Sequence, residues 1–182
     1  MAAEKLRLLR IAETHAGYVT IRQARAAGVD VQRSDDWIPV REGIFRLAGW
    51  PGGPFDEFAM WSGYFDDAAV MSHQTAAELH GIGTLHPRFV HMTASVRLPA
   101  PRHVSVHTAA LGPDDTERVG AFAVTTPVRT VLDLAAGGIA VPSLREVVAD
   151  AVAIGRLSVA EVLDRVSELT ERGAQRLVRA LT

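Results

Sequence analysis

The sequence predicts an α+β fold: an N-terminal winged helix-turn-helix, then a small mixed α/β domain with a helical C-terminal tail. Three observations predict it. Helical patterns with capping signals precede a hairpin pattern within residues 1–50. The segment PGGP at 51–54 has the composition of a linker. Beyond it, short apolar strand patterns alternate with helical ones. The predicted domains are therefore residues 1–50 and residues 55–182.

The first two helices are predicted from apolar periodicity and from one capping motif. Residues 3–15 place apolar side chains on one helical stripe, and Gly17 ends that helix. A second helix is predicted over 21–27, because Thr20 and Gln23 form a Thr-x-x-Gln capping box. In such a box each side chain satisfies a backbone amide that has no partner within the helix.

A third helix and a hairpin complete the predicted head. Gly28 supplies the turn, and Asp30 is the expected cap of a helix over about 31–37. The short turn allows the second helix to support the third, as helix-turn-helix geometry requires. Pro39 assigns the first hairpin strand to a sheet edge. The alternating apolar residues of the hairpin are Ile38, Val40, Phe45 and Leu47.

The second domain is predicted to combine a small sheet with several helices. Thr126 and Pro127 mark one helix start, and Ser72 is expected to cap another helix that ends at Gly81. Two Ser-x-x-Glu boxes predict further helix starts, at Ser143/Glu146 and Ser158/Glu161. The expected strands cover 68–71, 88–94, 103–107 and 121–125, and the other expected helices cover 55–66 and about 173–181.

Composition limits the protein class but does not identify a partner. The chain has 182 residues, 48% of them apolar, and a net charge of −2. Residues 1–50 carry eight basic and six acidic side chains, and the remainder carries eleven and fifteen. This distribution permits a DNA-binding head. There is no cysteine, no signal-peptide pattern and no apolar run of membrane-spanning length, so we expect a cytoplasmic protein with no membrane partner.

No sequence pattern indicates an enzyme, a metal or a cofactor. His73 and His80 share a helix face, and His103 and His107 share a strand face, so a metal site is one interpretation, but the motif HExxH is absent. Neither pair has a carboxylate at a ligand spacing, so hydrogen-bonding histidines are the favoured interpretation. The motifs GxSxG, GxGxxG and GxxxxGKS are absent. We therefore expect no catalytic residue, no metal and no cofactor.

One helix of the second domain carries a charge pair. Arg129 and Asp133 lie at i and i+4, a spacing at which an ion pair forms on a helix surface. The alternative interpretation is that Arg129 organises a domain interface or a partner site.

The head contains the side chains most suited to DNA. Gln32, Arg33 and Ser34 lie at the expected start of the third helix, where base edges are read in helix-turn-helix proteins. Arg41 lies at the hairpin tip, within reach of phosphate or the minor groove. Phosphate is also the expected contact of Arg22 and Arg25.

Two aspartates oppose this interpretation. Asp35 and Asp36 lie on the predicted reading helix, where their charge repels phosphate. They either point away from the DNA, pair with Arg41 or Arg46, or face the groove and weaken the reading. In the last case the head is a protein-docking scaffold. No heptad pattern indicates an oligomeric state.

Four sequence blocks resemble the AbiEi-type antitoxins, the transcription-regulator halves of type IV toxin–antitoxin operons. The blocks are GYVTIRQARAAGV, WIPVREGIFRLAG, AVMSHQTAAELHGI and VTTPVRTVLDLAA, and the resemblance covers about residues 3–175. It implies a winged helix that binds operator DNA of its own promoter and represses the operon, and a second domain that counters a cognate nucleotidyltransferase-like toxin. The operator contacts it implies are Arg22, Gln23, Arg25, Gln32, Arg33, Ser34, Arg41 and Arg46. The alternative is a module that docks a toxin or another partner without sequence-specific DNA binding.

Overall fold

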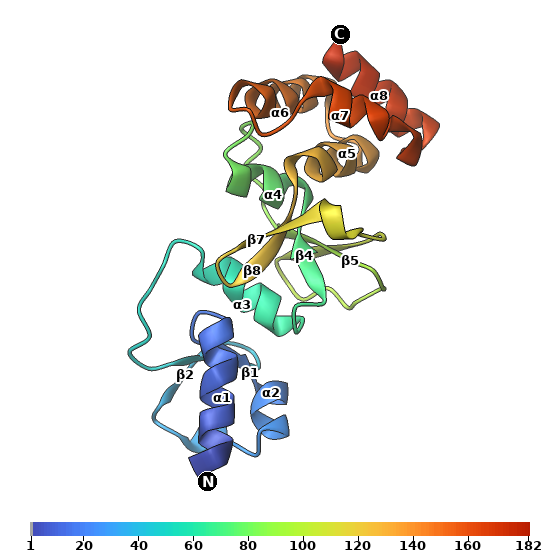
Figure 1. Cartoon of the computed structure of the whole chain (residues 1–182). Helices are drawn as coiled ribbons and strands as arrows, with labels where there is room; N and C mark the ends of the chain where they lie inside the picture. The colour runs from blue at the N-terminus through green and yellow to red at the C-terminus, as the bar shows by residue number, and fades with distance from the viewer. Residues whose placement is uncertain (1) are drawn as a thin grey trace. The chain divides into compact units, whose positions relative to one another are not determined.

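The computed structural model describes residues 2–182 and has a mixed α and β fold with two sheets (Figure 1). The chain forms two compact units. The first contains the residues up to Ala68 together with 118–122, and the second contains 69–117 and 123–182. The domain boundary predicted at 51–54 differs from this division, because helix α3 (Asp56–Tyr64) packs against a strand of the first unit.

The first unit has a three-stranded antiparallel sheet with the strand order β1-β3-β2. Its elements in chain order are α1 (Ala2–Thr14), β1 (Tyr18–Thr20), α2 (Ile21–Ala26), the 3₁₀ turn η1 (Val31–Arg33), β2 (Trp37–Arg41), β3 (Ile44–Leu47) and α3. Each helix and strand before α3 contributes to one apolar core, which contains Leu8, Ala12, Val19, Ala24, Ala27, Val31, Trp37 and Phe45.

The predicted third helix is wrong. Asp30 accepts a hydrogen bond from the Gln32 amide at 3.1 Å, as a cap should, but only one 3₁₀ turn follows. Ser34 is already extended, at φ −118° and ψ 126°. Ser and Asp favour caps and turns over helix interiors, since their side chains compete for backbone hydrogen bonds. Trp37 is buried as the first residue of β2, and this burial fixes the chain as a strand.

The other local predictions for this unit are largely confirmed. Both hydrogen bonds of the Thr20–Gln23 capping box form. The strand β2 lies at the sheet edge, and its register shifts between Pro39 and Arg41, as proline at an edge allows. Strand β1 is not predicted, because three buried residues are too short to show an alternating pattern.

The second unit is built on a five-stranded sheet with the order β6-β5-β4-β8-β7. The strands of this sheet are β4 (Ala69–Met71), β5 (Val90–Ala94), β6 (Val104–Thr108), β7 (Thr116–Val119) and β8 (Phe122–Thr125). Residues 118, 119 and 122 of β7 and β8 are grouped with the first unit. The sheet is mixed: β4 is antiparallel to β5 but parallel to β8, and β5 is parallel to β6. The prediction missed β7, whose polar residues show no clean apolar alternation.

Helix α5 (Pro127–Gly137) is the centre of the helical part of this unit. It contacts α4 (His73–His80), α6 (Val141–Ala153), α7 (Val159–Asp164) and α8 (Glu171–Leu181). A second 3₁₀ turn, η2, spans Pro113–Asp115, and a third, η3, spans Val166–Glu168. Figure 1 shows these helices gathered around α5. Within the described range 2–182, no helix is long and apolar enough to cross a membrane.

The helix caps of this unit are partly as predicted. Thr126 caps α5, and the Ser158–Glu161 box of α7 forms. The Ser143 start is wrong, because α6 already begins at Val141, with Pro142 in its first turn. Ser72 precedes α4 but its side chain caps no backbone amide.

The Ser72 hydroxyl instead belongs to a buried polar cluster of serine, threonine and histidine. It lies 3.0 Å from His73 Nδ1 and accepts a 2.8 Å hydrogen bond from Thr93 Oγ1. The rings of His73 and His107 stack with centroids 3.7 Å apart, and His91 Nδ1 lies 3.0 Å from His107 Nε2. Three rings in such contact disfavour a positive charge on any of them.

Burial lowers the pKa of His73 to about 3, with further lowering from His107 and His91. Burial also lowers the pKa of His91 to about 4, and that of His107 is lowered by the same cause. In the unfolded chain these imidazoles take up protons below about pH 6.5. The contribution of the neutral histidines to the free energy of unfolding is therefore fully present above pH 6.5. It is lost as the pH falls from 6.5 toward 3, because the unfolded chain then binds more protons than the folded one.

We predict that the free energy of unfolding falls as pH is lowered through this window. His73 alone contributes a slope of about 1.4 kcal/mol per pH unit, because it binds one more proton in the unfolded chain. The substitution His73→Asn should reduce the slope by that amount in urea titrations between about pH 4 and 6. His103→Asn is the matched control, since His103 is exposed and shares the positive φ. Equal slopes for wild type and His73→Asn would contradict the prediction.

Candidate nucleic-acid interface

The eight predicted DNA-contacting residues lie in the first unit and divide into two groups. The side chains of one group are held by acidic residues of helix α3 and of the turn that follows it. The other group lies around the turn between α2 and β2. The first group is Arg22, Gln23, Arg41 and Arg46, and the second is Arg25, Gln32, Arg33 and Ser34.

Asp66 binds two side chains at the start of α2 that are predicted to contact DNA. Arg22 Nη2 lies 2.6 Å from Asp66 Oδ2 and donates to the Tyr64 carbonyl at 3.2 Å. Gln23 Nε2 donates to Asp66 Oδ1 at 2.7 Å and to the Gly63 carbonyl at 3.0 Å. The Gln23 Oε1 atom is already used in the capping box. Both side chains therefore join α2 to the end of α3.

The hairpin arginines contact the start of α3 in the same way. Arg46 Nη2 donates to Asp56 at 2.7 Å, and its guanidinium lies 5.2 Å from the centroid of the Tyr18 ring. Arg41 Nη2 donates to Glu57 at 3.3 Å, and its guanidinium lies 5.4 Å from the Trp61 centroid. The Arg46 pair is about four-fifths buried, whereas the Arg41 pair is about half exposed.

The two aspartates of the predicted reading helix, Asp35 and Asp36, have different surroundings. Asp36 lies 2.5 Å from Lys5 Nζ on α1, and this hydrogen bond to Lys5 lowers the pKa of Asp36. The predicted alternative, in which the aspartates pair with Arg41 or Arg46, is wrong, because those arginines bind α3. Asp35 is exposed. Lys5 thus neutralises one of the two charges that oppose phosphate binding.

Arg25, Gln32 and Arg33 remain exposed, at the end of α2 and on η1. Among residues 2–182, neither arginine forms a salt bridge, although α3 and its turn pair with every other predicted arginine. Ser34 is half-buried and its hydroxyl contacts Asp36. Among the predicted contacts, the arginines without a salt bridge therefore lie at the α2–η1 turn.

The histidine pairs do not form a metal site. His73 and His107 stack, whereas His80 Nε2 contacts the Thr125 carbonyl at 2.7 Å and His103 is exposed. In the part of the chain that the structure describes, no group of three or more His, Asp or Glu side chains is arranged to hold a metal. The histidines of β5 and β6 meet His73 through stacking geometry, which sequence spacing does not reveal.

The Arg129–Asp133 pair forms but is buried. Arg129 Nε donates to Asp133 Oδ1 at 2.8 Å, and its Nη1 lies 3.3 Å from Asp115 Oδ2. Arg165 also pairs with Asp115, at 2.7 Å. Burial raises the pKa of Asp133 to about 6, although Arg129 acts in the opposite direction. The prediction of a surface pair is wrong, because Arg165 and the buried Asp115 enclose it.

Comparison with known proteins supports the fold. No family model and no curated protein matches the chain. The chain is similar in structure to the crystal structure of the RV2827C protein from Mycobacterium tuberculosis, with a TM-score of 0.57 and 16% sequence identity. The match covers 97% of this chain and 77% of that chain. At this identity the similarity concerns the fold alone.

The ion pairs with α3 predict unequal effects on stability. Arg46→Ala should lower the free energy of unfolding by about 1–2 kcal/mol, because it removes a largely buried pair and the contact with Tyr18. Arg41→Ala should cost less than about 1 kcal/mol, since its pair with Glu57 is half exposed. Urea unfolding of the two variants measures the difference. Arg25→Ala serves as the neutral control, and a larger loss for Arg41→Ala than for Arg46→Ala would contradict this assignment.

Proposed function

We propose that the chain is a DNA-binding regulator of the AbiEi-type antitoxin class, with a winged helix-turn-helix in its first unit. The element order α1-β1-α2-η1-β2-β3 and the strand order β1-β3-β2 support it, because they are the order of a winged helix whose third helix is reduced to one turn. The observation that carries the proposal is the exposed, unneutralised Arg25 and Arg33 on either side of the helix-turn-helix corner.

Each exposed side chain of this corner has a distinct role in the proposal. Arg33 and Gln32 lie on η1, where a shortened reading element presents its side chains to base edges. Arg25 lies at the end of α2, the position of the supporting helix, and contacts phosphate. The hairpin of β2 and β3 acts as the wing. Arg22, Gln23, Arg41 and Arg46 fix the wing and α2 to α3 and contribute little to DNA affinity.

The antitoxin role rests on the resemblance, and the structure explains what its most specific blocks do. SHQTAAELHG forms α4 and TTPVRTVLDLA forms α5, and these two helices pack together. Thr75, Thr130 and Asp133 of these blocks are buried. The residues of these blocks therefore stabilise the fold of the second unit. They support membership of the family because a shared fold would require the same buried residues. Relief of the toxicity of a neighbouring nucleotidyltransferase-like gene product by co-expression tests the role directly.

A second candidate function is the docking of a protein without DNA reading. It is favoured by the exposed apolar side chains Ile38 and Val40 on β2, which are 52% and 44% exposed. Binding of a toxin to the purified chain, together with equal affinity for all DNA duplexes, would favour this candidate over a sequence-specific repressor.

We predict salt-dependent binding to the DNA immediately upstream of the chain's own coding sequence. Neutralisation of about two phosphates by the two arginines of the corner, Arg25 and Arg33, gives a slope of log affinity against log salt of about −2. Fluorescence anisotropy with a labelled duplex over a salt series measures the slope. A random duplex of equal length is the control, and equal affinity for both duplexes would exclude specific repression.

Single arginine substitutions distinguish the two groups of predicted contacts. Arg25→Ala should weaken binding to all duplexes and make the salt slope shallower by about one, whereas Arg33→Ala should reduce the preference for the upstream duplex. Arg22→Ala is the matched control, because Arg22 lies on the same helix but is paired with Asp66. If Arg22→Ala and Arg25→Ala weaken binding equally, the assignment of the DNA-facing surface is wrong.

A further inference from the structure

The outer edge of the five-stranded sheet at β6 presents backbone groups that face no other strand. The Val90 amide donates to the His103 carbonyl at 2.9 Å, and the Ala109 amide donates to the Ala94 carbonyl at 3.1 Å. In a parallel ladder, alternate residues of a strand bond to the same neighbour. The amides and carbonyls of Val106 and Thr108 therefore point away from β5, and no strand of the described chain lies beyond them.

This edge lacks the features that usually protect an edge strand. The register of β5 and β6 is regular over five residue pairs, with no bulge. Strand β6 has the sequence VSVHT, without proline, lysine or a carboxylate. The edge strand of the first unit, by contrast, contains Pro39 and a register shift, and β7 at the opposite edge of this sheet carries Glu117 and Arg118.

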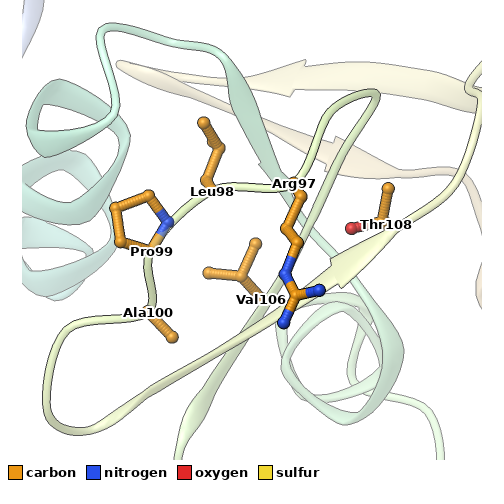
Figure 2. A pocket seen from close by; sticks show the side chains of 6 residues that line it. All are labelled: Arg97, Leu98, Pro99, Ala100, Val106 and Thr108. Atoms are coloured by element: carbon orange, nitrogen blue, oxygen red, sulfur yellow. The ribbon is translucent and has the colours of Figure 1, made fainter.

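A shallow pocket of about 650 Å³ adjoins the two free backbone positions. Val106 and Thr108 line it from the strand, and the loop after β5 supplies its other walls (Figure 2). Figure 2 shows the Arg97 side chain directed toward the strand that carries Val106 and Thr108. The lining is otherwise aliphatic, with Leu98, Pro99 and Ala100.

The charge of this region selects for an acidic ligand. Residues 79–113 contain no aspartate or glutamate, in a chain whose net charge is −2. They contain three arginines, Arg88, Arg97 and Arg102, all exposed. Across the described part of the chain, none of the three forms a salt bridge. No carboxylate of the described chain lines the pocket, so Arg97 can pair there with a carboxylate of a ligand.

We propose that the β6 edge and this pocket bind an extended acidic peptide segment by strand addition. The free amides and carbonyls of Val106 and Thr108 pair with the peptide backbone. Successive side chains of an extended segment point to opposite faces, so alternate positions face the pocket, where an apolar side chain contacts Leu98 and Val106 and a carboxylate reaches Arg97. A peptide fits better than nucleic acid because the pocket has no aromatic ring on which a base can stack.

The test uses the full chain and a fluorescein-labelled peptide of about seven residues, an ordinary strand length. Every second position of the peptide carries valine and glutamate in turn, so that both side chains lie on the face toward the pocket, and threonine fills the positions between them. We expect saturable binding in fluorescence anisotropy and slower amide hydrogen exchange at Val106 and Thr108. Arg97→Glu should weaken the affinity at least about tenfold. Arg172→Glu is the matched control, since Arg172 is an exposed arginine on α8 without a salt bridge in the described structure.

Two further probes keep the test independent of variant folding. Two versions of the peptide, each methylated on one of the two alternate sets of backbone nitrogens, lose the donors on opposite edges, and strand addition predicts that one of the two no longer binds. The same peptide with lysine in place of glutamate should bind at least about tenfold more weakly. Unchanged binding of both methylated peptides would overturn the proposal. So would protection of Val106 and Thr108 by self-association alone, or tighter binding of a single-stranded oligonucleotide at this edge.

Discussion

The arrangement of the first unit depends on ion pairs between arginine side chains and the carboxylates of α3 and of the turn that follows it. Asp56 and Glu57 of α3 pair with Arg46 and Arg41, and Asp66 in the turn that follows α3 pairs with Arg22. These pairs join the hairpin and α2 to α3 and its turn. An arginine that forms an ion pair with a carboxylate must break that pair before it can bind phosphate. The number of basic side chains in residues 1–50 therefore overstates their attraction for DNA. Of the five arginines predicted to contact DNA, three are therefore held in ion pairs, and Arg25 and Arg33 are not.

Local signals in the sequence predict most of the helices, because capping residues and apolar periodicity act over a few positions. Thr20, Thr126 and Ser158 each cap a helix as their spacing indicates. The third helix fails for a tertiary reason: burial of Trp37 in a strand outweighs the cap at Asp30. The ion pairs with α3 were not predictable, since no sequence rule indicates which carboxylate a distant arginine meets.

The second unit shows why specific motifs need not mark a functional site. The blocks that carry the family resemblance place polar side chains inside the fold: Ser72 and Thr93 contact each other, and Arg129 and Asp133 are enclosed beside Asp115. Buried polar groups must find partners, so their positions are more constrained than those of exposed ones. A sequence resemblance in such residues is therefore direct evidence about the fold, but only indirect evidence about the activity.

The net charge of the chain does not show where its charged groups lie, because acidic and basic side chains are distributed unevenly over the two units. In the first unit carboxylates pair with Arg22, Arg41 and Arg46, whereas Arg25 and Arg33 form no salt bridge among the described residues. In the second, the long stretch from 79 to 113 lacks carboxylates altogether, and Arg97 lies there beside an open sheet edge. Screening confines the influence of each charge to about 8–10 Å at ordinary salt. An overall charge of −2 is therefore compatible with the two separate sites that we propose for anionic partners.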